Sequence, residues 1–84
     1  MNYETLVEHQ TGVNLLAASS HTVTMTFTYD IESIENFTFM NDNPTQALLR
    51  DVSISDNVLT IEMRSYSAGP VPVDFTFIVT IRGK

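Results

Sequence analysis

Hydrophobic and polar residues alternate with a period of two over two long stretches of the chain. In residues 71–82 apolar side chains occupy every second position, and most positions between them are polar. Residues 22–29 show the same alternation, with four threonines on one face. Successive side chains of a strand point to opposite faces, so both stretches are predicted as half-buried strands. The longer stretch is typical of a central strand or of one that bends between two sheets. The predicted buried face of residues 22–29 consists of Val23, Met25, Phe27 and Tyr29.

A β-hairpin is predicted around residues 56–57, where aspartate and asparagine tolerate the backbone of a tight turn. A two-residue loop there sets Ile54 opposite Leu59 and keeps the apolar residues of both strands together. The same register sets Asp51 opposite Glu62, which is mildly destabilising unless a neighbouring arginine offsets the two charges. The predicted apolar face of the hairpin consists of Val52, Ile54, Leu59, Ile61 and Met63.

A further strand is predicted over residues 34–40, with Phe37 and Phe39 on one face. The first nineteen residues leave two alternatives open. Short strands at residues 3–7 and 13–17 around a loop at residues 9–12 would cover an otherwise bare sheet. A helix that begins near Asn2 and ends at Gly12 fits the same residues, and we favour the strands.

These elements predict an all-β chain. We expect residues 1–84 to form one small antiparallel β-sandwich that is immunoglobulin-like and has about six to seven strands. The cysteines and the tryptophan that mark antibody domains are absent from the sequence, so no functional residue can be assigned by analogy. The structural alternative is an α+β domain in which an antiparallel sheet carries a short N-terminal helix.

Composition excludes several classes of function but does not identify the function. The chain has 84 residues and a formal net charge of −6, from ten acidic and four basic side chains. Four cations are too few to follow a phosphate backbone, so we expect neither nucleic-acid binding nor attraction to acidic membranes. The absence of cysteine excludes disulfides, thiolate zinc sites and cysteine nucleophiles. The sequence has no apolar run like that of a signal peptide, so we expect the protein to be made in the cytoplasm. Assembly into a particle after synthesis is one further expectation.

No catalytic, cofactor or metal site is predicted. The two histidines, His9 and His21, belong to no recognisable motif, and a thin sandwich of this size rarely contains an enclosed pocket. Asp30, Glu32 and Glu35 form the densest acidic group. They lack the ordered spacing of a calcium loop, so a solvated loop is the favoured interpretation over a cation site or a contact with a basic protein.

The sequence therefore predicts a non-enzymatic protein-interaction or assembly module that acts through a protein partner or through self-association, with a homo-oligomer as one form. By analogy at the level of the fold, the more specific prediction is a small decoration, tail or connector protein of a virus particle. The alternative is a small acidic inhibitor of a host protein that acts by protein binding or DNA mimicry. The candidate interaction surface consists of Asp30, Glu32, Glu35, Tyr66, Pro70 and Ile78.

Overall fold

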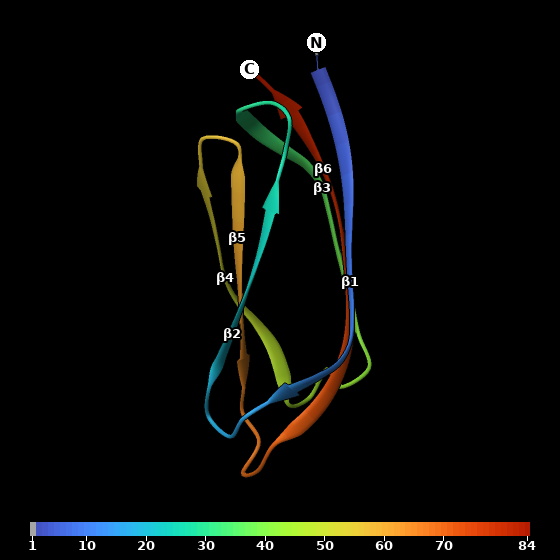
Figure 1. Ribbon diagram of the computed structural model, residues 1–84, viewed down its shortest axis with the longest axis vertical. Coiled ribbons are helices and arrows are strands. Elements are labelled where there is room, and N and C mark those ends of the chain that lie inside the picture. Colours follow the sequence, from blue (N-terminus) through green and yellow to red (C-terminus); the bar gives the residue numbers. More distant parts are fainter. Residues whose placement is uncertain (1) are drawn as a thin grey trace.

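The computed structural model describes residues 2–84, which form six β-strands in two antiparallel three-stranded sheets (Figure 1). The chain is all-β, as predicted, and the two sheets pack face to face as a small β-sandwich. No helix in the described part of the chain is long and apolar enough to cross a membrane. The strands are β1 (Asn2–Leu15), β2 (Ser20–Thr26), β3 (Ile31–Asn41), β4 (Ala47–Ser55), β5 (Val58–Ser65) and β6 (Val71–Gly83).

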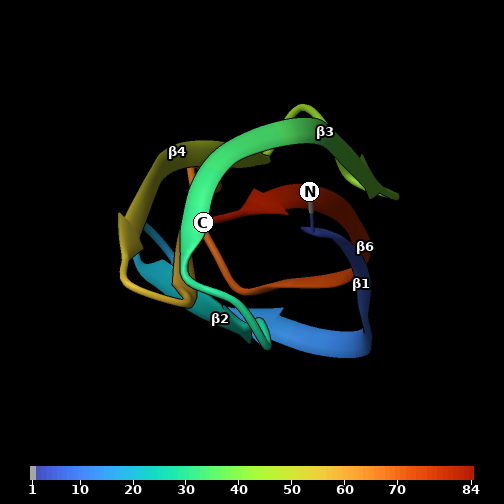
Figure 2. The same cartoon turned by 90° about the horizontal axis from the view of Figure 1, so that it is seen from above.

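Strand order places β6 and β5 at the centres of the two sheets. One sheet has the order β1-β6-β3 and the other the order β2-β5-β4. The three strands β2-β5-β4 correspond in order to strands B-E-D of an immunoglobulin constant domain, and the pair β3-β6 corresponds to its strands C-F. Here β1 occupies the place of the last strand, G, beside β6. Figure 2 shows the result: β3 lies beside β4 on one side of the sandwich, and β1 lies beside β2 on the opposite side.

The core lies between the two central strands. Every second residue of β6, from Val71 to Ile81, is buried, and so are Leu59, Ile61 and Met63 of β5. Phe77 of β6 is fully buried, and its ring stacks on that of Phe39 with 4.7 Å between the ring centres. Of the two alternatives for residues 71–82, a central strand and one that bends between sheets, the structure shows the central strand, because β6 has a neighbour on each side of one sheet.

The predicted hairpin register is also confirmed. Ser55 pairs with Val58, Ile54 with Leu59, and Asp51 lies opposite Glu62. Asp56 has a φ of 54°, the left-handed conformation that the turn requires. The like charges of Asp51 and Glu62 are offset by Arg50, whose Nε lies 3.5 Å from Glu62 Oε1.

Two sequence-based expectations need correction. The strand predicted over residues 22–29 ends at Thr26, so Val23, Met25 and Phe27 are buried but Tyr29 is 38% exposed. The N-terminal residues form one strand rather than two, because the expected loop at residues 9–12 is a bulge in β1. Gly12 supplies the bulge with a φ of 63°, and its N–H donates to Asp74 Oδ1 at 2.7 Å.

Candidate functional site

On the side of the sandwich between β1 and β2, polar side chains occupy several inner-face positions of β1, beside the apolar Leu6 and Val13. Glu4, Glu8 and Gln10 lie opposite core residues of β6, so they belong to the inner face of β1. Glu4 accepts hydrogen bonds from the N–H of Thr28 at 2.8 Å and from its hydroxyl at 3.1 Å. Gln10 Nε2 donates to Glu8 Oε1 at 2.9 Å, and Gln10 Oε1 lies 3.3 Å from His21 Nε2. Polar contacts thus link β1 to β2 and to the loop after it.

The opposite side, between β3 and β4, is bordered by apolar side chains. We call this region the apolar slot and define it by Phe37 and Phe39 of β3 and Leu49, Val52 and Ile54 of β4. All five lie opposite core residues of the central strands, so they belong to the inner faces of the two sheets. Leu49 is nevertheless 40% exposed and Ile54 46% exposed, and the other three are half-buried.

Hydrogen bonds close both ends of the apolar slot. At one end the N–H of Ile31 donates to the carbonyl of Asp56, in the turn between β4 and β5, at 2.9 Å. At the other end Asn41 Nδ2 donates to the carbonyl of Ala47 at 3.0 Å. The two edge strands are therefore tied together at their ends, and the exposed apolar side chains lie between the ties.

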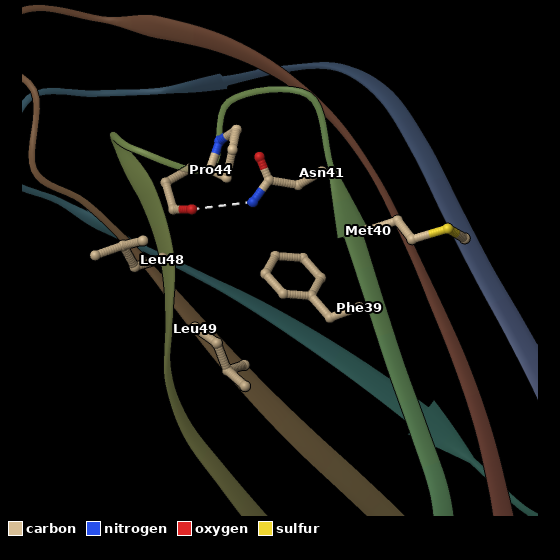
Figure 3. A pocket seen from close by; sticks show the side chains of 7 residues that line it. Phe39, Met40, Asn41, Pro44, Leu48 and Leu49 are labelled. Carbon is tan, nitrogen blue, oxygen red and sulfur yellow. Dashed lines mark hydrogen bonds between the residues drawn. The ribbon is translucent and has the colours of Figure 1, made fainter.

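A pocket of about 470 Å³ lies at the end of the slot near the connection between β3 and β4. Figure 3 shows the ring of Phe39 between the two strands, with the side chains of Met40 and Leu48 directed away from it. The dashed line in that figure is the Asn41 bond that closes the slot. The described residues that line the pocket are Phe39, Met40, Asn41, Pro44, Ala47, Leu48 and Leu49.

The chemistry of this lining favours apolar contact and backbone hydrogen bonding. None of the described lining residues is titratable, so the pocket offers no acid–base pair. Over residues 2–84, no group of three or more histidine, aspartate or glutamate side chains is placed to hold a metal ion. Most of the lining consists of apolar side chains from the two edge strands and the connection between them.

The predicted acidic surface lies at the end of the molecule that carries the termini (Figure 1). Glu32 Oε2 lies 2.8 Å from Arg82 Nε, and Glu35 Oε1 lies 3.8 Å from the same atom. The carbonyl of Asp30 accepts a hydrogen bond from the N–H of Lys84 at 2.9 Å. The carboxylates of Glu32 and Glu35 therefore face a cation of the chain itself.

The three predicted apolar anchors lie elsewhere. Tyr66 is 59% exposed, and it and Pro70 belong to the connection between β5 and β6, at the end of the molecule opposite the termini (Figure 1). Ile78 is half-buried on the outer face of its sheet, where it pairs with Val7 and Thr38. The fold does not bring the six predicted surface residues together at one site.

The apolar slot was missed because its residues follow the same pattern as a core. Phe37, Phe39, Val52 and Ile54 alternate with polar residues, so the sequence predicts only that they share apolar faces of their strands. Alternation identifies the face on which a residue lies, but it does not reveal whether another strand covers that face. The shortage of charge along residues 47–55, where only Arg50 and Asp51 are charged, is the one feature that could have drawn attention to this edge.

Comparison with protein-family models, with curated proteins and with solved structures finds no match to this chain.

Proposed function

We propose that the protein is an interaction or assembly module whose binding surface is the apolar slot between β3 and β4. The single observation that supports the proposal most strongly is the exposure of inner-face side chains there, with Leu49 40% and Ile54 46% exposed. Exposed apolar side chains on the inner face of an edge strand, beside a pocket with an apolar lining, are typical of a binding site.

The partner that best fits the slot is an extended segment with alternating apolar side chains. Such a segment would hydrogen-bond to the open edge of β4 and place its apolar side chains against Phe39 and Leu49. This form of recognition adds a strand to an existing sheet, so it needs no helix, cofactor or metal. The absence of enzymatic activity stays a prediction, as does the version in which the protein belongs to a virus particle.

The acidic-inhibitor alternative gains no specific support. The acidic side chains lie on different parts of the molecule: Glu32 and Glu35 face Arg82, whereas Glu4 and Glu8 border the side between β1 and β2. A mimic of DNA would need carboxylates aligned along one face. We therefore retain this function only as the second prediction.

Selection from a displayed library of extended peptides tests the proposal. We expect selected peptides to have alternating apolar residues, and the Leu49→Lys variant to lose their binding at least about tenfold. The matched control is Val7→Lys, which places the same charge on an exposed apolar position of β1, outside the slot, and should bind as the unmodified protein does. Equal binding to both variants, or no selected peptide, would contradict the proposal.

A further inference from the structure

The four edge strands differ in how they are protected against pairing. Strand β1 has a bulge and inward-pointing acids, and β3 has two register shifts and carries Glu32 and Glu35. The polar links from Gln10 and Glu4 connect β1 to the start of β2 and to the loop after it. Strand β4 has one bulge, at Arg50, and apolar residues on both sides of it. Inward charges and bulges are the usual protection of an edge. Strand β2 has neither a register shift nor a charged residue, and its side is covered by the polar links to β1. On β4, by contrast, the inner side chains at the edge are apolar and partly exposed, which leaves this edge open to pairing.

The hairpin register shows which backbone groups of β4 face outward. Ser55 and Val58 flank the two-residue loop, so they form a hydrogen-bonded pair, and such pairs alternate along an antiparallel ladder. Ser53 and Asp51 therefore direct their N–H and C=O groups toward β5. Val52 and Ile54 direct theirs toward the open side. Beyond the bulge, Leu48 and Arg64 form the next hydrogen-bonded pair. The backbone N–H and C=O groups of Leu49 therefore face the open side of β4.

A second β4 in antiparallel orientation can pair with this edge in a register that matches backbone groups and side chains together. Centring the two-fold axis between positions 50 and 51 sets Leu49 opposite Val52 of the second copy, and both have outward backbone groups. Both also lie on the inner face, so the apolar side chains of the two copies meet on the same side of the joined sheet.

The same register matches the charges. Arg50 lies opposite Asp51 of the second copy, and Asp51 lies opposite Arg50 of that copy. Both side chains belong to the outer face, because Asp51 pairs with Glu62 and Arg50 contacts Glu62 at 3.5 Å. These are the only two charged residues of β4, and the two-fold axis pairs each of them with its opposite.

We infer that two copies of this chain associate edge to edge along β4, joining their three-stranded sheets into one sheet of six strands. The inference rests on the proposed function and names its partner as a second copy of this chain. Pairing over about six residues spans roughly 20 Å and buries on the order of 500 Å² per copy, below the about 800 Å² of a standard interface. The dimer is therefore reversible, with a dissociation constant on the order of 10–100 µM.

Charge exchange at the two-fold axis provides the test. Sedimentation measurements over a range of concentrations determine the dissociation constant of the unmodified chain and of two variants. Arg50→Glu sets Glu opposite Asp51, and Asp51→Arg sets Arg opposite Arg50, so each variant alone should weaken association at least about tenfold. An equimolar mixture of the two variants has opposite charges in both positions, and it should associate within about threefold of the unmodified chain. Thr24→Glu, on the outer face of β2, is the control and should dimerise normally.

Each outcome decides the inference. Weaker dimerisation of both single variants, with recovery of dimerisation in their mixture, supports the inference. A chain that stays monomeric at about ten times the expected dissociation constant overturns it, and so does a dimer that Arg50→Glu leaves intact. Thermal melting checks that both variants fold. If one does not fold, hydrogen exchange of the unmodified chain decides instead: the Val52 amide should exchange more slowly as the protein concentration rises. A monomer that still binds the selected peptides through the slot overturns only the second-copy inference, whereas a monomer without peptide binding overturns the proposed function as well.

Discussion

Both sides of the sandwich leave a gap between an edge strand of one sheet and an edge strand of the other, but different side chains border the two gaps. Between β1 and β2, Glu4 and Gln10 form hydrogen bonds across the gap. Between β3 and β4, Phe39 and Leu49 face the gap from opposite strands, and the hydrogen bonds lie only at its ends. The first arrangement discourages a further strand and the second favours one. The same fold thus has a protected side and a binding side.

The largest expected effect concerns the core beneath the binding side. Phe77→Ala removes a fully buried ring that stacks on Phe39, so we expect a loss of about 3–5 kcal/mol in the free energy of unfolding, measured by urea denaturation. Phe39→Ala should cost about half as much, because solvent already reaches that ring from the slot. Equal losses would show that Phe39 is as well covered as Phe77 and that the slot is not open.

The protected side should depend on Glu4. Glu4→Ala removes both hydrogen bonds to Thr28, so the free energy of unfolding should fall by about 1 kcal/mol. Glu32→Ala is the control, because its carboxylate is 50% exposed and its ion pair with Arg82 is worth no more than about 0.5 kcal/mol. A smaller loss for Glu4→Ala than for this control would argue against polar closure of the side between β1 and β2.

Glu8→Val would make the protected side resemble the binding side. The substitution removes an inward-pointing charge from an edge strand and extends its apolar inner face. We expect Glu8→Val to change the free energy of unfolding by less than about 1 kcal/mol. The double variant Glu8→Val with Arg50→Glu separates the two edges, because Arg50→Glu weakens association through β4. We expect this double variant to self-associate, in sedimentation measurements, at concentrations where the Arg50→Glu chain is monomeric. Its failure to associate would show that the acid is not what protects β1.

The smallest effect is expected at the edge of the slot itself. Arg50→Ala leaves Asp51 and Glu62 opposed without their cation, so stability should fall by about 0.5 kcal/mol at low salt. At about 1 M salt the charges are screened and the difference should disappear. Thermal melts at the two salt concentrations, below the dimerisation range, measure this. A loss that salt does not change would assign the role of Arg50 to packing instead.

Much of the fold could be predicted because it depends on local patterns. The hairpin register follows from the turn at Asp56 and from the requirement that Ile54 and Leu59 share a face. The length and alternation of β6 favour either a central strand or one that bends between sheets, and the strand order selects the centre. The single N-terminal strand was missed because Gly12 permits a bulge at a place where its sequence also fits a loop.

The binding side could not be predicted for a physical reason. Ile54 and Leu59 have the same pattern in the sequence, yet Leu59 is fully buried and Ile54 is 46% exposed. The difference arises because β5 lies between two strands whereas β4 is an edge strand with a single neighbour. This is a property of the strand order. Likewise, the predicted surface at Tyr66 and Glu32 was chosen from residue types, and the fold separates those residues to opposite ends.

Hydrogen exchange of the edge amides tests the difference between the two sides most directly. In the unmodified chain, the outward amides of Leu49 and Val52 should become more protected as the protein concentration rises, whereas the edge amides of β1 should exchange at the same rate throughout. Protection that rises equally on both edges, or that changes on neither, would contradict the assignment of the side between β3 and β4 as the binding side.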